Sequence, residues 1–129
     1  MANTDNTITM IAGGAITEFA LVSLDAAGKC VVTTAATDAK VIGVAQRAVS
    51  TGEAVDVVVS GITRVIAGAT ITFNTNPLLM ATTAGKVIAH TGSGNYSACR
   101  AIPNINQTGA AGDGEQISVF FTGPQVLIP

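Results

Sequence analysis

A turn-and-strand segment occurs twice in this chain, and the duplication constrains the fold more than any other feature of the sequence. Residues 51–62 read Thr-Gly-Glu-Ala-Val-Asp-Val-Val-Val-Ser-Gly-Ile, and residues 113–124 read Asp-Gly-Glu-Gln-Ile-Ser-Val-Phe-Phe-Thr-Gly-Pro. The Gly-Glu pair and the later glycine keep the same spacing in both copies. Each copy predicts a turn, an acidic residue, a strand with side chains alternating between two faces, and a second turn at Gly61 or Gly123.

Two further blocks recur in the same order. Gly28–Val32 matches Gly85–Ala89, and Ala45–Val49 matches Ala98–Ile102, so that Arg47 and Arg100 stand in matching places. The offset changes from block to block, as expected for two copies of one unit separated by loop insertions; chance similarity between glycine-punctuated strands is the alternative. The extra length of the second copy falls in residues 103–114, a predicted exposed loop.

Short β-prone runs between glycine, aspartate and asparagine residues fill the rest of the chain. The predicted strands are residues 19–24, 29–34, 41–45, 54–60, 62–66 and 69–73. No window carries a long apolar repeat of helical period, and only residues 78–83 suit a short helical turn. The sequence therefore predicts an all-β fold, a compact β-barrel or sandwich of the β-tulip kind, built from two related strand-turn-strand halves with little or no helix.

The domain organisation follows from the repeat. We expect residues 1–12 to form an N-terminal arm and residues 13–129 to form a single β domain, the size of one hydrophobic core. Within that domain the two copies are predicted at residues 13–66 and 67–123, followed by a C-terminal tail at residues 124–129.

The composition restricts the possible partners. The chain is 48% hydrophobic but only 4% aromatic and 11% charged, against a usual charged share of about 25%. A net charge of −2 gives no field for a polyanion, so nucleic-acid binding is not expected. A weakly charged, apolar-rich surface promotes association, which favours an oligomer over the alternative of a soluble monomer.

Neither a membrane segment nor a secretory signal is expected. The apolar run of residues 10–24 is interrupted by Gly13, Gly14 and Glu18, and no basic residue precedes Lys29. No run approaches the roughly 20 apolar residues that span a bilayer. The chain is therefore expected to be made and kept in a cytoplasm-like space.

Cysteine usage gives the same interpretation. Cys30 and Cys99 lie in apolar contexts without metal-ligand spacing, and both are predicted to be core residues; a disulfide between them is the alternative.

The sequence offers little for catalysis. His90 is the single histidine and is predicted at a strand end, with no Gly-x-Ser-x-Gly element to supply a nucleophile. Residues 92–94 read Gly-Ser-Gly but lack the lysine of a phosphate-binding loop, and residues 113–115 supply too few oxygens for Ca²⁺. We therefore expect no enzyme activity and no catalytic, cofactor or metal site.

The order of the first-half motifs resembles a family of small capsid decoration, or cement, proteins of tailed bacteriophages. The segments that carry the resemblance are Gly14–Thr17, Leu21–Leu24, Gly28–Lys29, Val41–Ala45 and Gly52–Val57, and the second half matches through Gly85–Val87 and Gly114–Glu115. The clearest similarity covers residues 13–60. Glu18-Phe19 departs from the family, which commonly has a glycine there, and Ser97–Ala101 replaces a second Val-Ile-Gly-Val-Ala.

The resemblance implies a structural protein without catalytic activity, often a homotrimer, that stabilises contacts between major capsid subunits. Such a protein lies on the outer capsid surface of the virion and is made in the bacterial host cytoplasm. The polar, nearly uncharged arm is a candidate capsid contact; a frayed terminus is the alternative. The candidate capsid-contact residues in that arm are Asn3, Thr4, Asn6, Thr7 and Ile8.

The apolar tail supplies a second set of candidates. Val126, Leu127 and Ile128 are candidate oligomer or capsid contacts, and an ordinary last strand is the alternative. A different function, a virion or cell-surface module that binds glycans, is hinted at only by Tyr96, because the chain has no tryptophan.

Overall fold

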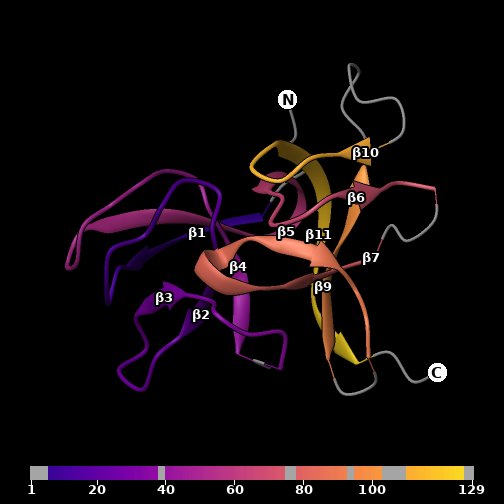
Figure 1. Cartoon of the computed structure of the whole chain (residues 1–129). Coiled ribbons are helices and arrows are strands. Elements are labelled where there is room, and N and C mark those ends of the chain that lie inside the picture. The colour runs from indigo at the N-terminus through magenta and orange to yellow at the C-terminus, as the bar shows by residue number, and fades with distance from the viewer. Residues whose placement is uncertain (1–5, 38–39, 75–77, 93–94, 103–109, 127–129) are drawn as a thin grey trace.

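The computed structural model describes residues 6–37, 40–74, 78–92, 95–102 and 110–126, and these residues are built from antiparallel strands (Figure 1). The strands are β1 (Asn6–Ile11), β2 (Leu21–Leu24), β3 (Cys30–Val32), β4 (Val41–Ala45), β5 (Ala54–Ile66), β6 (Ile71–Thr72), β7 (Leu78–Ala81), β8 (Val87–Ala89), β9 (Tyr96–Ile102), β10 (Ala110–Ala111) and β11 (Gln116–Val126). The predicted all-β class is confirmed.

Nine strands of the described ranges form one sheet. The order is β3-β2-β4-β5-β11-β9-β7-β8, and β1 pairs with β5 on the edge opposite β4, while β6 and β10 form a separate two-stranded ladder. Figure 1 shows the sheet curling, with the indigo-to-magenta strands on one side of the molecule and the orange and yellow strands on the other.

The strand β5 joins these two sides. Its residues 54–60 pair with β1, and its residues 61–66 pair with β11. The partner changes at Gly61, whose φ of +102° is open to glycine at little cost. The predicted turn at Gly61 is therefore wrong, because a positive φ here bends a continuous strand from one half onto the other. For description we call residues 6–60 the first half and residues 61–126 the second half.

Gly123 repeats this behaviour in β11. Its φ is +84°, and the register of β11 against β9 shifts between Phe121 and Gln125. Gly123 therefore also lies inside a strand, at a bulge, and the turn predicted there is wrong as well.

The same hydrogen bonds recur in both halves at the start of the repeated segment. Ala12 donates to the Glu53 carbonyl at 2.9 Å, and Gly52 donates to the Ala12 carbonyl at 2.8 Å. In the second half Ala67 donates to the Glu115 carbonyl at 2.9 Å, and Gly114 donates to the Ala67 carbonyl at 2.8 Å. The two related halves are thus confirmed, whereas the predicted boundary between residues 66 and 67 stays a prediction.

A further repeat explains why β1 and the end of β5 behave alike. Residues 11–17 read Ile-Ala-Gly-Gly-Ala-Ile-Thr, and residues 66–72 read Ile-Ala-Gly-Ala-Thr-Ile-Thr. Gly13 donates to the Cys30 carbonyl at 2.8 Å, and Gly68 donates to the Val87 carbonyl at 2.7 Å. β1 therefore opens the first half as residues 61–66 open the second.

The strand register corrects one detail of the predicted repeat. Val44 lies opposite Val58 in the first half, and Arg100 lies opposite Phe120 in the second. Because Val58 and Phe120 hold the same place in the duplicated segment, Arg100 corresponds to Val44. The predicted match of Arg100 with Arg47 is wrong; Arg47 lies in the loop after β4.

Two other expectations need correction. Residues 78–81 are the strand β7, and the 3-10 turn η1 (Thr83–Gly85) follows them, so the short helical turn expected at residues 78–83 is mostly strand. Ala110 and Ala111 of the predicted loop form β10 and pair with β6, while residues 103–109 lie outside the described part.

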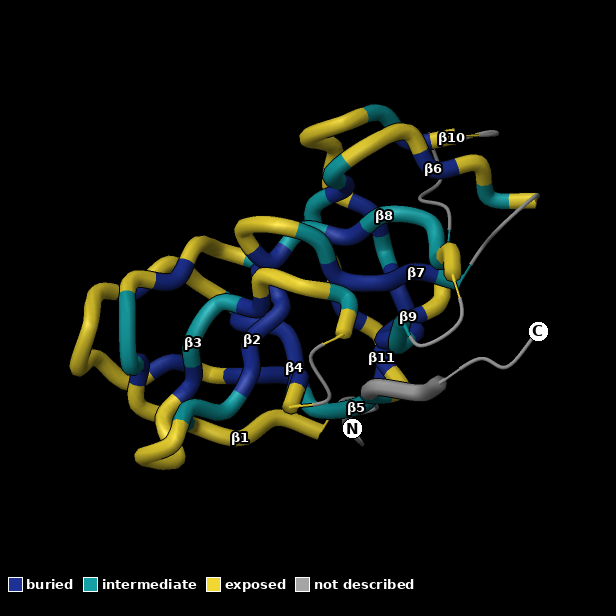
Figure 2. Tube along the Cα trace, turned by 60° about the horizontal axis from the view of Figure 1, so that its bottom comes forward, coloured by how far each residue is buried: buried dark blue, intermediate teal, exposed yellow. Residues whose placement is uncertain are grey.

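The core consists of two apolar clusters, which Figure 2 shows as the dark blue segments. The smaller cluster belongs to the first half and contains Val22, Cys30, Ala45, Val55 and Val57 among others. The larger cluster contains the inward residues of the second half together with Leu21, Val41 and Val44 of the first half. The two halves are therefore packed against each other through a shared core.

Candidate functional site

The titratable residues singled out in the sequence serve local structure. His90 directly follows β8, as predicted, and its Nε2 lies 2.9 Å from the Asn95 carbonyl oxygen. The Glu53 carboxylate accepts a hydrogen bond from the Ser50 amide at 2.7 Å across its turn. Within the described ranges, no group of three or more histidine, cysteine, aspartate or glutamate residues is placed to hold a metal ion.

The two cysteines lie in different clusters. Cys30 and Cys99 are both buried and free, which confirms the prediction of core thiols over a disulfide. Burial raises the pKa of the Cys99 thiol to about 12 and also raises the pKa of Cys30. Neither thiol is a nucleophile at neutral pH, because the reactive form is the thiolate.

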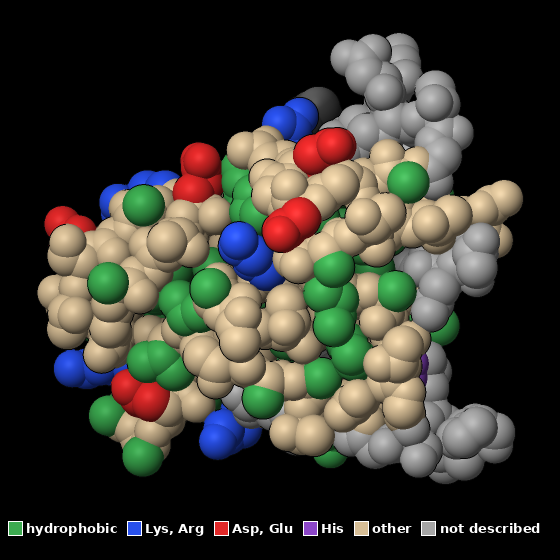
Figure 3. Space-filling view, viewed as in Figure 1, with side chains coloured by type: hydrophobic (Ala, Val, Ile, Leu, Met, Phe, Trp, Pro, Cys, Tyr) green, Lys and Arg blue, Asp and Glu red, His purple; other side chains and the backbone are tan. Residues whose placement is uncertain are grey.

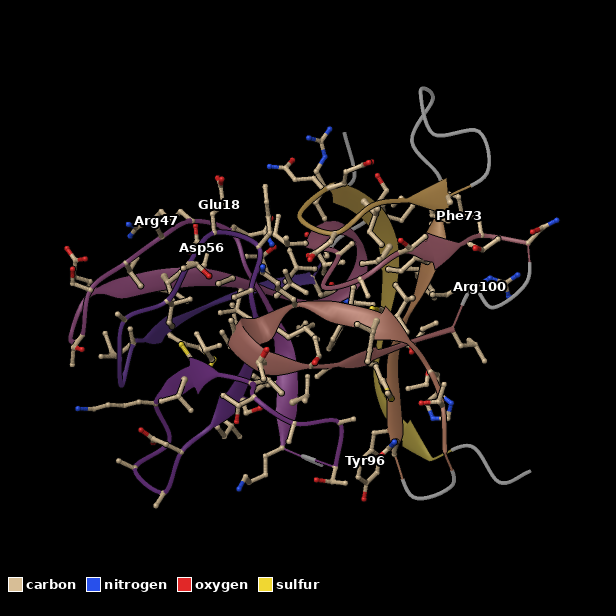
Figure 4. All side chains as sticks on the ribbon, in the orientation of Figure 1. Glu18, Arg47, Asp56, Phe73, Tyr96 and Arg100 are labelled. Atoms are coloured by element: carbon tan, nitrogen blue, oxygen red, sulfur yellow. The ribbon has the colours of Figure 1, made fainter. Side chains whose placement is uncertain are left out.

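Arg47 and Asp56, which are labelled in Figure 4, also have structural roles. Arg47 is exposed and donates a hydrogen bond to the Ala54 carbonyl. Glu18, Arg47 and Asp56 all belong to the first half (Figure 4). Tyr96, the residue that hinted at glycan binding, is half-buried at the start of β9.

The predicted capsid contacts of the arm fall partly on β1. Asn6, Thr7 and Ile8 are exposed residues of this strand, which runs along the edge of the first half and is yellow in Figure 2; Asn3 and Thr4 lie outside the described residues. The Asn6 amide donates to the Ser60 hydroxyl at 2.7 Å, and the Thr9 hydroxyl donates to the Asp56 carboxylate at 2.9 Å. Residues 6–11 are therefore bound to the chain's own β5, and their contact with a capsid stays a prediction.

The predicted contacts of the tail lie at the end of β11. Val126 is the last residue of that strand and pairs with Tyr96. Leu127 and Ile128 lie outside the described residues.

A surface that the sequence did not predict lies on the outside of the second half. Four residues from neighbouring strands stand side by side there, and we call them the second-half outer row: Ile62, Phe120, Arg100 and Leu78. Ile62 is 52% exposed, Phe120 is 44% exposed, and Arg100 is also exposed. Figure 4 shows Arg100 on the side of the second half that faces away from the first half. The alternation of residues 116–121 was the signal for this row, since Phe120 faces opposite to buried Ile117, Val119 and Phe121.

Charged side chains are sparse on the face of the molecule that Figure 3 shows. Figure 3 shows Lys, Arg, Asp and Glu side chains as scattered groups on a face that is otherwise apolar, polar uncharged or backbone. An exposed phenylalanine and an arginine on a rigid sheet have the composition that protein–protein interfaces favour, with aromatic residues and arginine enriched. The described residues therefore include an exposed row whose composition is of the kind enriched in protein–protein interfaces.

Comparison with known proteins bears on the fold. No protein-family model and no curated protein matches the sequence. Among solved structures, the chain is similar to the N base of head fiber gp8.5 of bacteriophage phi29, with a TM-score of 0.67 and 15% sequence identity. The similarity covers 94% of this chain and 98% of that one, so the two share a fold over essentially their whole length.

The helices offer no candidate for a membrane span. In the described part of the chain, none is both long and apolar enough to cross a bilayer.

Proposed function

We propose that the protein is a structural component of a tailed-phage head, a decoration protein that binds the outside of the capsid and stabilises contacts between major capsid subunits. The observation that carries the proposal is the fold shared with the phi29 head fiber base over 94% of the chain. The order of motifs in residues 13–60 supports the same assignment independently, because it was identified from sequence alone.

The physical character of the described surface suits this role. A decoration protein needs a rigid body and many modest contacts, and a curled antiparallel sheet with exposed apolar residues provides both. In a homotrimer each contact is presented three times, so the overall affinity for a repeating lattice rises without any new kind of contact. The proposed partners are the major capsid protein and two further copies of this chain, on the outer surface of a virion assembled in the bacterial cytoplasm.

Co-sedimentation with expanded empty heads of the phage that encodes the protein tests this proposal. We expect the purified protein to pellet with the heads at a saturating stoichiometry and to raise the temperature at which they rupture. A protein that stays in the supernatant at concentrations well above those of the capsid subunits would overturn the proposal.

The arm is tested separately. A variant lacking residues 2–5 keeps β1, whereas a variant lacking residues 2–10 also removes most of that strand from β5. If the arm contacts the capsid, the first variant loses head binding while its unfolding midpoint is unchanged. Unchanged binding of this variant would limit the contact to β1 or to another surface, and a variant lacking residues 127–129 tests the tail in the same way.

A further inference from the structure

The two halves dock through surfaces that can be named. The first-half outer row is the set of residues equivalent to the second-half outer row: Thr7, Val58, Val44 and Leu21. Leu21 and Val44 are fully buried and lie in one cluster with Val65, Leu79 and Phe121 of the second half. The outer face of the first half therefore covers the inner face of the second half.

Hydrogen bonds fix this docking. The Gln46 side chain donates to the Thr63 hydroxyl at 3.0 Å, and the Gly85 amide donates to the Thr33 carbonyl at 2.8 Å. Gly85 fits closely, because a Cβ added to it would lie 2.7 Å from the Cβ of Ala20. The turn after β7 therefore packs against the start of β2, in a contact that uses different surfaces of the two halves.

The counterparts of the docking surfaces are partly exposed in this chain: Met10 and Val59 lie at the border of the first-half cluster, while Val22, the counterpart of Leu79, is fully buried within it. In the second-half outer row, Arg100 and Phe120 occupy the register positions that Val44 and Val58 occupy in the first half. On the other docking surface, Phe121 and Val65 are 1% and 0% exposed, whereas their first-half counterparts Val59 and Met10 are only half-buried. Ile8, the counterpart of buried Thr63, is 42% exposed. We call Ile8, Met10 and Val59 the first-half rim.

We propose that the second-half outer row of one copy docks on the first-half rim of another copy, in the arrangement that the two halves of one chain already use. The partner in this interface is a second copy because the chain itself carries the matching face. The inference rests on the self-association named in the proposed function, and it specifies which surfaces meet. An interface between two different surfaces is heterologous, and such interfaces close into rings, including trimers, when the rotation between copies permits.

One residue difference distinguishes the proposed contact between copies from the contact between the two halves of one chain. Arg100 stands where Val44 is buried, so the interface between copies keeps a charged group. Its guanidinium can lie over apolar neighbours such as Phe120 while its charged end reaches the solvent at the border of the interface. This composition predicts a weaker and more reversible contact between copies than between halves.

Sedimentation velocity of the intact protein over a concentration series tests the inference without capsids. We expect the unaltered chain to form an oligomer, and Phe120→Asp and Ile62→Asp each to raise its dissociation concentration at least tenfold. Ile8→Asp alters the opposite surface and should have the same effect. Ile11→Asp is the matched control, because Ile11 is 43% exposed but lies in neither surface; its oligomer should be unchanged.

Mixing the variants separates a heterologous contact from other arrangements. Phe120→Asp keeps an intact rim, and Ile8→Asp keeps an intact outer row, so an equimolar mixture should form a dimer that neither variant forms alone. An unaltered chain that stays monomeric, or variants that keep the unaltered mass, would overturn the inference. If Phe120→Asp instead abolished binding of a monomeric chain to heads, the row would belong to the capsid contact, and the proposed function would survive without this inference. Thermal unfolding of each variant identifies any that fails to fold. If Phe120→Asp fails to fold, Ile62→Asp provides the test of the second-half outer row.

Discussion

The two halves of this molecule have one fold but use the same face differently. In the first half, Leu21, Val44 and Val58 are buried at 0%, 0% and 3% exposure, and Leu21 and Val44 lie in one cluster with residues of the second half. In the second half, the residues at the same register positions include Arg100 and the 44% exposed Phe120. A duplicated unit therefore supplies an internal packing face in one half and an exposed surface at the equivalent register positions of the other.

The largest effect on stability is expected when a buried residue of the first half is replaced by its exposed counterpart from the second half. Val44→Arg places the second-half residue in the buried site, and we expect it to lower the free energy of unfolding by at least about 4 kcal/mol. An unpaired buried charge costs about 3–5 kcal/mol, and overpacking adds about 1–3 kcal/mol. Urea denaturation measures the loss.

The reverse exchange is the control. Arg100→Val lies on an exposed position and should change the stability of the monomer by no more than about 0.5 kcal/mol. If Val44→Arg were tolerated equally well, the first-half outer row would not be buried against the second half.

The close pairing of β4 with β5 gives the next largest expected effect on stability. A Cβ added to Gly43 would lie 2.3 Å from the Val58 carbonyl oxygen, whereas the second half accommodates the Cys99 side chain at the equivalent position. We expect Gly43→Ala to destabilise the protein by about 2–3 kcal/mol, since the backbone must move. Gly14→Ala, where an added Cβ meets nothing within 4 Å, should leave the unfolding midpoint nearly unchanged. Similar midpoints for the two variants would argue against the close approach of β4 to β5.

Much of the architecture was accessible from the sequence, because alternating valines between glycine-rich turns predict strands with little ambiguity. β4 was predicted with its observed bounds, and the buried cysteines followed from their apolar contexts. The turn expected at Gly61 was wrong, since a glycine that permits positive φ serves a bulge as well as a turn. The repeated Ile-Ala-Gly segment was present in the sequence and would have identified β1 as a sheet strand rather than a free arm.

The alternation of residues 116–121 indicates that Phe120 faces outward, but the sequence does not show which residues of the other strands stand beside it. Val44 and Arg100 differ in character, but only the strand register shows that they hold equivalent positions. Which half covers which face depends on docking contacts such as Gln46 with Thr63, which join residues without any local sequence pattern.

Alkaline pH should sharpen the comparison between the two clusters. In the folded protein burial raises the pKa of Cys99 from 9.0 to about 12. The unfolded chain therefore loses this proton first, and stability falls as the pH rises from 9 toward 12, by at most about 1.4 kcal/mol per pH unit. Cys99→Ala should remove this loss between pH 9 and 10.5, about 2 kcal/mol, measured by urea denaturation at both pH values.

Cys30 provides the comparison for that measurement. Burial also raises its pKa, but a backbone hydrogen bond to its ionised form opposes the effect. Cys30→Ala should therefore flatten the alkaline loss less than Cys99→Ala does. An equal or larger effect of Cys30→Ala would show that the cluster around Cys99 does not exclude water more strongly than the cluster around Cys30.

The smallest expected effect concerns the two equivalent hairpin turns. Ala84 has a φ of +61° in the turn after β7, a conformation that costs a residue with a Cβ about 1 kcal/mol or more. Ala84→Gly should raise stability by about 1 kcal/mol, visible as a higher midpoint in thermal unfolding. Ala27→Gly in the equivalent turn after β2 should give no gain, since glycine there only adds freedom to the unfolded chain. A higher unfolding midpoint for both variants would mean that the two turns do not differ in backbone strain.

Cysteine cross-linking between copies tests the central claim most directly. Within the chain the Gly85 amide meets the Thr33 carbonyl at 2.8 Å, and the residues equivalent to these two are Gly28 and His90. If copies dock as the halves do, a mixture of Gly28→Cys and His90→Cys chains should oxidise to a covalent dimer on a non-reducing gel. Neither variant alone should do so, and the buried native cysteines should not interfere. A mixture that yields no dimer, or variants that cross-link equally well alone, would contradict the claim that the exposed face of the second half repeats the docking of the first.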